Sequence, residues 1–507
     1  MREHFRTRRW RVGPAKFRTR WVALSGALIV TAVLVTAGGA GANVALAQVS
    51  ADPFTNTTSQ HATEVEPDTF AFGGTVVAAF QVGRFFSGGG TDIGFARSGN
   101  GGATWGTPGF LPGMTFSSGD ASSPYERVSD PSVAYDSSHG TWLISSIPLL
   151  PGTTVVPTVF VNRSTNDGRT WGGPVSIPPP TSNSVDLDKN WTVCDNVSTS
   201  FRGHCYTELD NFGDGDRELM STSTDGGLTW STPIQTAGHD KGLGGQPVVQ
   251  PSGRVVVPFE SLNGTISSFF SDDGGLSWSR GSKVAAIRFH SVAGGLRTSP
   301  LPSAEVAADG TVYVAWEDCR FRKNCTSNDI VFSESTDGVN WSDVARVPID
   351  AVTSGVDHFI PGLAVDPTTS GAATHLALTY YFYPDANCGG ACRLEVGYIS
   401  SPDGGAHWGA PTQLAGPMAL SEIAQTSQGT MVGDYISTSF SGGHATTVFA
   451  VGHETTTAAF DEGMWAPTTP LAVATAAQAT TAASSAGVAG PITGEGTRET
   501  HQALKQR

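Results

Sequence analysis

The chain has 507 residues, with 45 Asp and Glu against 30 Lys and Arg and a formal net charge of −15. This acidic balance argues against nucleic acid as a partner, because a phosphate backbone requires a basic surface. The 62 Gly and 30 Pro residues, together with little helical periodicity, exclude a mainly helical protein and predict many short strands.

The first predicted element is an export signal, residues 1–47. Residues 1–20 hold eight Lys or Arg and one acid, whereas residues 21–47 hold no charged residue. Small residues ending in Ala45-Leu46-Ala47 resemble a cleavage site. An uncleaved membrane anchor is the alternative, because the apolar stretch is near the length of a bilayer span. In both cases we expect an exported bacterial protein that is extracellular or at the cell surface, with membrane contact only through this segment.

An eight-residue sequence then recurs along the chain. It is clearest at residues 223–230, Ser-Thr-Asp-Gly-Gly-Leu-Thr-Trp, and its six copies end at Trp105, Trp171, Trp230, Trp278, Trp341 and Trp408, the fifth being one residue shorter. The Asp or Asn of each copy can accept N–H bonds within its own turn, and the following Gly supplies a positive φ. We therefore predict that these acids are structural. Their spacing of 48 to 67 residues suits a four-stranded propeller blade with long loops.

Strand patterns surround each copy in the same order. In the fifth repeat, for example, they fall at residues 304–308, 311–316, 329–333 and 345–349. After the last copy, residues 431–440 and 446–451 indicate further strands, and residues 463–465 a last one. We therefore predict an all-β β-propeller over residues 48–466, with seven four-stranded blades favoured, closed by strands from both termini, and six as the alternative. Residues 467–507 are rich in Ala and Thr, and we expect a disordered tail.

The recurring sequence resembles the Asp box, S-x-D-x-G-x-T-W, of bacterial neuraminidase-type repeats, known as BNR repeats. The resemblance covers roughly residues 60–455. It implies a β-propeller with the boxes on the face away from the binding cavity. It also implies a secreted or surface sialidase-like glycoside hydrolase of the exo-α-sialidase type, acting on terminal sugars of glycoconjugates.

A polar rim is predicted where the inner strands of a propeller begin, because these positions converge on one face. They hold His61, Glu64, Glu66, Glu126, Arg127, Asp130, Asp186, Asp188, Lys189, Trp191, His239, Asp240, Gln246, Arg297, Glu305, Asp357, His358, Asp434 and Tyr435.

The sialidase resemblance gives roles to some of these residues. It implies three Arg on the substrate carboxylate, a Tyr nucleophile activated by a Glu, and an Asp acid. We assign the first role to Arg127, Arg297 and Arg84, and the others to Tyr435, Glu305 and Asp130. The Arg-Ile-Pro sequence of those enzymes is missing, and residues 359–361, Phe-Ile-Pro, match it only in part.

A non-catalytic extracellular propeller that binds carbohydrate or protein is the alternative function. Calcium is then a possible ligand, because residues 210–216 place oxygen donors at alternating positions. We expect no other cofactor, no catalytic metal and a monomer. The six cysteines form close pairs, 194 with 205, 319 with 325 and 388 with 392, and they predict three local disulfides rather than a zinc site.

Overall fold

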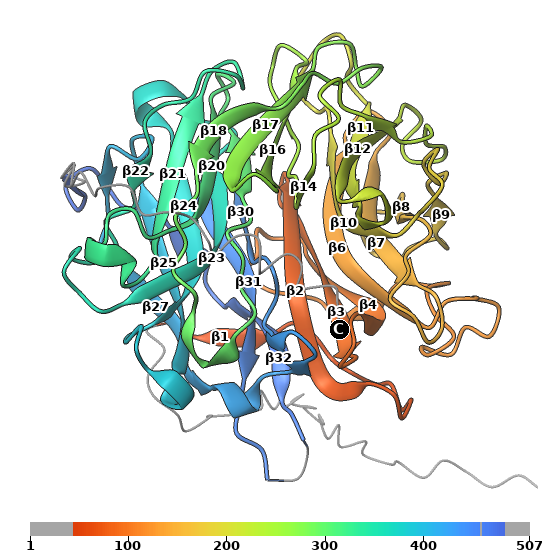
Figure 1. The fold of residues 1–507 in the computed structure, drawn as a ribbon, viewed down its shortest axis with the longest axis horizontal. Helices are drawn as coiled ribbons and strands as arrows, with labels where there is room; N and C mark the ends of the chain where they lie inside the picture. Colours follow the sequence, from red (N-terminus) through yellow and green to blue (C-terminus); the bar gives the residue numbers. More distant parts are fainter. Residues whose placement is uncertain (1–43, 457–458, 482–507) are drawn as a thin grey trace, which may run out of the picture. The chain divides into compact units, whose positions relative to one another are not determined.

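The computed structural model describes residues 44–456 and 459–481, and this part of the chain is all-β (Figure 1). No helix in these residues is long and apolar enough to cross a membrane. The predicted export signal lies outside them, apart from residues 44–47. Within the described ranges there are six short 3-10 helices: η1 (Phe212–Asp214), η2 (Ala293–Gly295), η3 (Lys323–Cys325), η4 (Gly371–Ala373), η5 (Gly389–Ala391) and η6 (Leu420–Glu422).

The strands fall into sets of hydrogen-bonded neighbours, numbered here in chain order. Sets 1 to 3 are β2 (Gln60–Phe72), β3 (Thr75–Arg84), β4 (Gly90–Ser98) and β5 (Gly109–Phe110); β6 (Arg127–Asp136), β7 (Thr141–Leu149), β8 (Phe160–Ser164) and β9 (Val175–Ser176); and β10 (Leu187–Cys194), β11 (Cys205–Asn211), β12 (Arg217–Ser223) and β13 (Ile234–Gln235). Sets 4 and 5 are β14 (Gly242–Leu243), β15 (Val248–Val249), β16 (Val255–Ser261), β17 (Thr265–Ser271) and β18 (Ser282–Ala286); and β19 (Ser303–Val306), β20 (Val312–Asp318), β21 (Asp329–Ser335) and β22 (Ala345–Arg346).

Sets 6 and 7 contain the last main strands. Set 6 is β23 (Asp357–Val365), β24 (Leu376–Tyr383), β25 (Arg393–Ser401) and β27 (Thr412–Ala419), and set 7 is β30 (Ser437–Ser441), β31 (His444–Gly452), β32 (Glu462–Pro467) and β1 (Leu46–Gln48), with β33 (Leu471–Ala472) also on β31. Two small pairs lie outside the sets: β26 (His407–Trp408) with β34 (Thr480–Thr481), and β28 (Gln425–Thr426) with β29 (Gly429–Thr430). Single pairings also join β2 to β32 and β4 to β6, so sets 7, 1 and 2 form one continuous sheet.

Set 7 unites the two ends of the described chain. β1 pairs antiparallel with β32, with Ala47 opposite Ala466, and Figure 1 shows these red and blue strands side by side. The described residues of the predicted tail also take part, because β33 pairs with β31 and β34 with β26. The structure of residues 467–481 therefore differs from the disordered tail that their composition predicts, because the pairing of β33 and β34 holds their backbone in place. Residues 482–507 lie outside the described residues.

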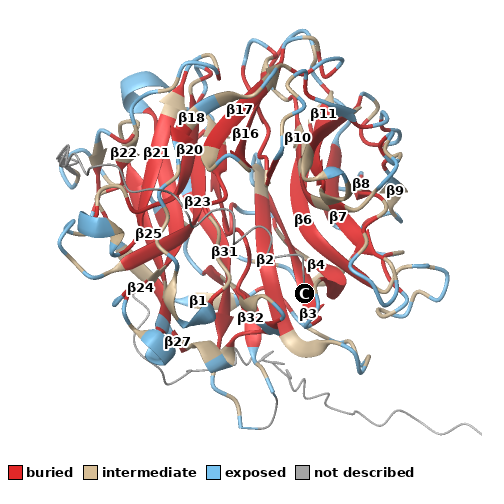
Figure 2. Ribbon diagram, in the orientation of Figure 1, coloured by how far each residue is buried: buried red, intermediate tan, exposed pale blue. Residues whose placement is uncertain are grey.

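One strand of each set, called its inner strand below, contacts the inner strands of its neighbours; these are β2, β6, β10, β15, β19, β23 and β30. Each contacts the next, and β30 contacts both β23 and β2. Separate apolar cores fill the spaces between sets; Val77 of set 1, for instance, packs in one core with Trp142 of set 2. Another core joins sets 6, 7 and 1 through Tyr381, Phe449 and Phe80. Figure 2 shows the result, with buried strands and exposed connecting loops.

The recurring sequences form the turns predicted for them. In residues 223–230, Asp225 accepts bonds from the Thr229 amide at 2.9 Å and from the Thr229 hydroxyl at 2.6 Å. Gly226 and Gly227 have φ of +69° and +79°. The acids of these turns therefore hold the backbone, which confirms the structural interpretation. The ends of the sets that carry these turns are called the box end below, and the opposite ends the site end.

All three predicted disulfides are present, Cys194–Cys205, Cys319–Cys325 and Cys388–Cys392. The first joins directly opposite residues of β10 and β11. The other two lie in loops, after β20 and after β24.

Candidate active site

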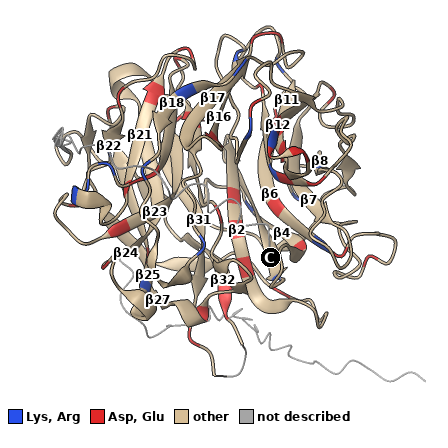
Figure 3. Ribbon diagram, viewed as in Figure 1, with Lys and Arg blue, Asp and Glu red and all other residues tan. Residues whose placement is uncertain are grey.

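Irregularities in three inner strands place charged side chains at the site end. The regular pairing is interrupted at Glu66 in β2, at Asp130 in β6 and at Lys189 in β10. These residues have φ of +55°, +51° and +43°, a region that L residues rarely occupy. Such bulges redirect side chains and often lie beside active sites. Figure 3 shows acidic positions within the strands β2 and β6 as well as on loops.

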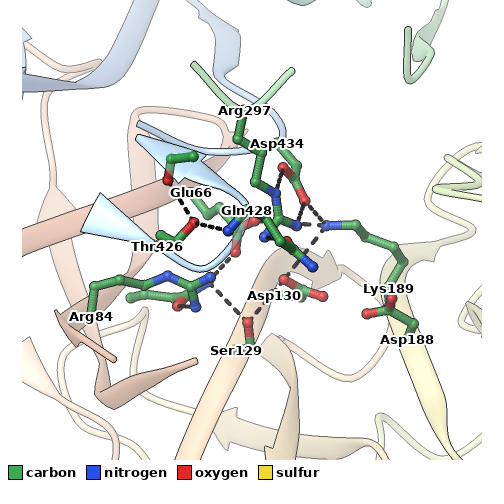
Figure 4. A network of polar contacts seen from close by, with 12 residues as sticks. Glu66, Arg84, Ser129, Asp130, Asp188, Lys189, Arg297, Thr426, Gln428 and Asp434 are labelled. Atoms are coloured by element: carbon green, nitrogen blue, oxygen red, sulfur yellow. Dashed lines mark hydrogen bonds and ion pairs between the residues drawn. The ribbon is translucent and has the colours of Figure 1, made fainter. Parts of the chain in front are cut away.

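These side chains meet in a group of six charged residues, called the central charge network: Glu66, Arg84, Asp130, Lys189, Arg297 and Asp434. Arg297 donates its Nε to Asp434 Oδ1 at 2.7 Å and its Nη2 to Oδ2 of the same carboxylate. The Lys189 ammonium also contacts Asp434 and lies 3.8 Å from Asp130 and 3.7 Å from Glu66. Figure 4 shows Arg297 and Lys189 converging on Asp434.

Burial and these contacts set the protonation of the acids in opposite directions. Burial, followed by the charge of Asp130, raises the pKa of Glu66 to about 8. Burial also acts to raise the pKa of Asp434, but Arg297 and Lys189 outweigh it and hold that pKa well below its usual range. Near neutral pH the network therefore holds an ionised carboxylate beside a carboxyl group that can take up or release a proton.

Burial and the neighbouring acids also shift the pKa values of two basic residues, Arg84 and Lys189, in opposite directions. Burial lowers the pKa of Arg84 to about 10 even though Glu66 opposes this shift. Burial acts to lower the pKa of Lys189, yet the surrounding acids raise it above its usual value. Both side chains remain cations near neutral pH.

Two adjoining pockets give solvent access to the network. One, of about 110 Å³, is lined by Glu66, Arg84, Asp130 and Arg297, and the other, of about 50 Å³, by Lys189, Arg297 and Asp434. Gln428, between β28 and β29, lines both and accepts a bond from Arg297. A small anionic ligand would therefore meet two guanidinium groups and one ammonium.

The structure brings together three of the six residues that the sequence assigned to the site, Arg84, Arg297 and Asp130. Arg127 turns away from the network, because its guanidinium donates to Ser87 Oγ at 2.9 Å and to the Gly88 carbonyl at 2.8 Å. These bonds anchor the loop after β3. Lys189 occupies the position beside Asp130 and Asp434 instead.

Within the described residues, no hydrogen bond joins Tyr435 to Glu305. The Tyr435 hydroxyl donates to the Pro131 carbonyl at 3.1 Å, and its ring packs edge-on against Trp191 at 5.2 Å. Burial, then the charges of Glu66 and Asp130, raise the pKa of Tyr435. Glu305 lines a separate cavity toward the box end.

Sequence reasoning listed Glu66, Lys189 and Asp434 in the polar rim but gave them no role. A usable signal was present, because Glu66 and Asp130 each precede a proline within an inner strand, as Ile360 does, and the pairing is interrupted at all three. Proline within a strand indicates a bulge or an edge. Gln428 had no such signal, since it lies in a short hairpin far along the chain.

Calcium ligands do not gather at residues 210–216 in any group of three within the described residues. Asp214 instead lies 3.5 Å from Arg217. The one group that the described residues form is Asp329, Asp350 and His358. Arg322 contacts both of its carboxylates at 2.6 Å and Arg346 contacts both as well, so two cations already neutralise this group.

The middle of the chain matches a known protein family. Residues 206–361 match the family described as a BNR repeat-like domain. This middle segment is similar to BNR repeat-like domains. The match spans sets 3 to 5 and the start of set 6, including three of the box turns. A comparison with curated protein sequences found no match.

Several solved structures resemble the chain at low identity. A protein of unknown function from Dyadobacter fermentans is 17% identical, with a TM-score of 0.45, covering 70% of this chain and 99% of that one. The NanB sialidase from Streptococcus pneumoniae is 12% identical, with a TM-score of 0.41 and coverage of 83% and 70%. An ulvan lyase of polysaccharide lyase family PL25 is 12% identical, with a TM-score of 0.47 and coverage of 83% and 95%. Similarity at this level does not assign any of these activities to this chain.

Proposed function

We propose that the seven strand sets are the blades of one β-propeller. Two observations support closure between the last set and the first. β30 of set 7 contacts β2 of set 1, and Gly102 in the first box turn lies so close to Thr446 of set 7 that an added Cβ would come within 2.3 Å of its hydroxyl. The other box turns make the same kind of approach to the preceding set, for example Gly227 to Leu143.

For its activity, we propose a glycan-acting enzyme, a sialidase-like glycoside hydrolase that removes terminal anionic sugars. The observation that carries this proposal is the convergence of Arg84, Arg297 and Lys189 with three carboxyl groups at two adjoining pockets. Cations fixed in a largely buried site attract an anionic substrate far more strongly than cations in bulk water do. We further propose that the protein is exported, as its first 47 residues predict.

The roles we propose follow the contacts. Arg84 and Arg297 bind the substrate carboxylate, and Lys189 adds a third positive charge. Asp434 holds Arg297 and Lys189 in place. Glu66 and Asp130 face the same pocket and are the groups for proton transfer, Glu66 because its pKa lies near neutrality. Tyr435 serves as nucleophile only if its hydroxyl leaves the Pro131 carbonyl, and Glu66 then replaces Glu305 as its proton acceptor.

Hydrolysis of a fluorogenic α-linked N-acetylneuraminic acid by residues 44–507 tests the proposal. We expect turnover by the parent protein, and a loss of at least about a hundredfold in Arg84→Lys, because an ammonium lacks the planar fork that grips a carboxylate. Tyr435→Phe removes a single hydroxyl and reports on the nucleophile. Arg254→Lys is the matched control, since Arg254 forms its own paired contact with Asp272 at the box end.

Each outcome has a distinct meaning. Turnover that is lost in Arg84→Lys and kept in Arg254→Lys supports the proposed site. Turnover unaffected by Arg84→Lys contradicts it, and absence of turnover in the parent protein contradicts a sialidase.

A non-catalytic glycan-binding propeller is the second candidate. The Tyr435 hydroxyl favours it, because this group is bonded to a backbone carbonyl rather than to a carboxylate that could activate it. Retention of immobilised sialoglycans without turnover, compared with and without calcium, distinguishes this function from the first.

A further inference from the structure

A second, larger cavity of about 280 Å³ lies toward the box end of the inner strands. Its walls come from the later residues of those strands, including Phe70, Val193, Val306 and Leu363. Phe72 and Val197 also line it and are 42% and 52% exposed, so the cavity reaches the surface at the turns that follow β2 and β10. Its volume approaches the lower end of the range for small-molecule sites, roughly 300 Å³.

Two aromatic residues separate this cavity from the central charge network. Trp191 lines the cavity, and it also lines a narrow space of about 20 Å³ that contains Lys189, Asp434 and Tyr435. The rings of Trp191 and Tyr435 pack edge-on at 5.2 Å. The cavity is therefore a distinct site and does not extend the sialidase-like pocket.

The charge of the cavity wall has one sign. Its lining includes two acids, Asp68 and Glu305, and no Lys, Arg or His. The Asp68 carboxylate is already bonded to the amides of Val133 at 2.6 Å and Thr69 at 2.7 Å. Glu305 is half-buried and faces the cavity, with the Val306 amide as its nearby backbone donor. Burial, followed by the charge of Asp68, raises the pKa of Glu305 to about 8, so its carboxyl keeps a proton near neutral pH and ionises when a cation binds beside it.

The chemistry of the wall selects the ligand. An acid in an apolar enclosure interacts strongly with a cation, because little water screens the charge. Aromatic faces add to this attraction, and Phe70, Phe440 and Trp191 line the same cavity. A neutral apolar ligand would offer no charge to the Glu305 carboxyl, and an anion would be repelled by the ionised form of either acid.

We propose that this cavity binds an organic ammonium ion with an apolar body, which donates an N–H to Glu305 and places its body against Phe70 and Trp191. The site belongs to the box end and acts independently of the proposed glycan site.

Calorimetric titration of residues 44–507 with 2-phenylethylammonium chloride tests the inference, with 2-phenylethanol as the neutral ligand of similar shape. We expect the ammonium to bind at least about tenfold more tightly than the alcohol. Glu305→Gln should remove this preference, because it keeps the shape of the side chain and removes the charge. The control is Asp343→Asn, an exposed acid that does not line the cavity and whose replacement should leave both affinities unchanged.

A second variant keeps the test decisive. Val193→Trp fills the cavity without touching the acids, and it should abolish binding of both ligands while the melting temperature shows that the protein remains folded. Equal affinity for the ammonium and the alcohol, ammonium binding unchanged in Glu305→Gln or in Val193→Trp, or no binding of the ammonium at all would each overturn the proposal. These readouts measure binding alone, so they stand apart from sialoside turnover.

Discussion

At the scale of single residues, the chain uses strained backbone to arrange charge. Glu66, Asp130 and Lys189 occupy a left-handed conformation that costs roughly 1–3 kcal/mol for each residue. The surrounding sheets hold them in this conformation, which directs their charged groups toward two adjoining pockets. Sequence alone identified most members of this set by their place in the repeat. It could not show which of them meet, because a bulge shifts the direction of each side chain.

Glu64 leads to a prediction about pH. It is buried, accepts the Ser50 hydroxyl at 2.8 Å, and burial raises its pKa from 4.5 to about 8. The folded state thus keeps a proton that the unfolded chain has released, so the stabilisation is complete below pH 4.5 and is lost as the pH rises toward 8. Relative to Glu64→Gln, the parent protein should lose at least about 1 kcal/mol between pH 5 and pH 8.

Urea unfolding of both proteins at several pH values in this range checks the expectation. Asp343→Asn provides the reference for an exposed acid, and its difference from the parent protein should stay constant. Parallel stability curves for the parent and Glu64→Gln would show that Glu64 is ionised in the folded protein.

At the scale of elements, the box turn is the part of the fold that sequence predicts best. Its Asp, Gly and Trp act within eight residues, so local spacing specifies the turn without knowledge of the rest of the chain. The site is harder to predict because it depends on distant segments. Arg127 shows the limit of such prediction. Its position in the repeat is that of a rim residue, but its guanidinium donates hydrogen bonds to the loop after β3. Gln428 shows the converse, because a short hairpin brings it to a pocket that its local sequence does not indicate.

Gly227 tests the role of the box turn in packing between sets. Its φ is +79°, and an added Cβ would lie 2.8 Å from Leu143 in the preceding set. Gly227→Ala should therefore destabilise the protein by about 2 kcal/mol, as measured by thermal or urea unfolding. Gly173→Ala is the control, because no atom lies within 4 Å of the added Cβ, and it should change stability by less than about 0.5 kcal/mol. Equal effects of the two changes would show that the box turn does not bear on the neighbouring set.

At the scale of the whole described chain, seven strand sets share cores with their neighbours, and the last also packs with the first. The repeat count predicted six of these sets directly from the boxes. The seventh lacks a box, and its outer strand is β1, two of whose three residues belong to the segment predicted as an export signal. Local sequence could not indicate that pairing, because residues 46 and 465 to 467 are far apart in the chain.

Removal of β1 should weaken the protein. A chain that begins at residue 49 leaves β32 without its outer partner, and we expect a melting temperature several degrees lower than that of a chain that begins at residue 44. If an export signal is removed in the cell, we expect cleavage before Ala45, whose carbonyl accepts the amide of Thr468 at 2.9 Å. Sequencing of the mature amino terminus checks this point. A terminus at Gln48, as the Ala45-Leu46-Ala47 site predicts, would mean that the mature protein lacks most of β1.

The pairing of β1 with β32 has a consequence for the order of events during synthesis. Residues 46–48 are made early in synthesis, yet their partner strand, residues 462–467, is made near its end. Until residues 462–467 have been made, β1 therefore has no partner strand, and the first and last sets cannot share their core. The contacts between the last set and the first can therefore form only after the final strands have been made.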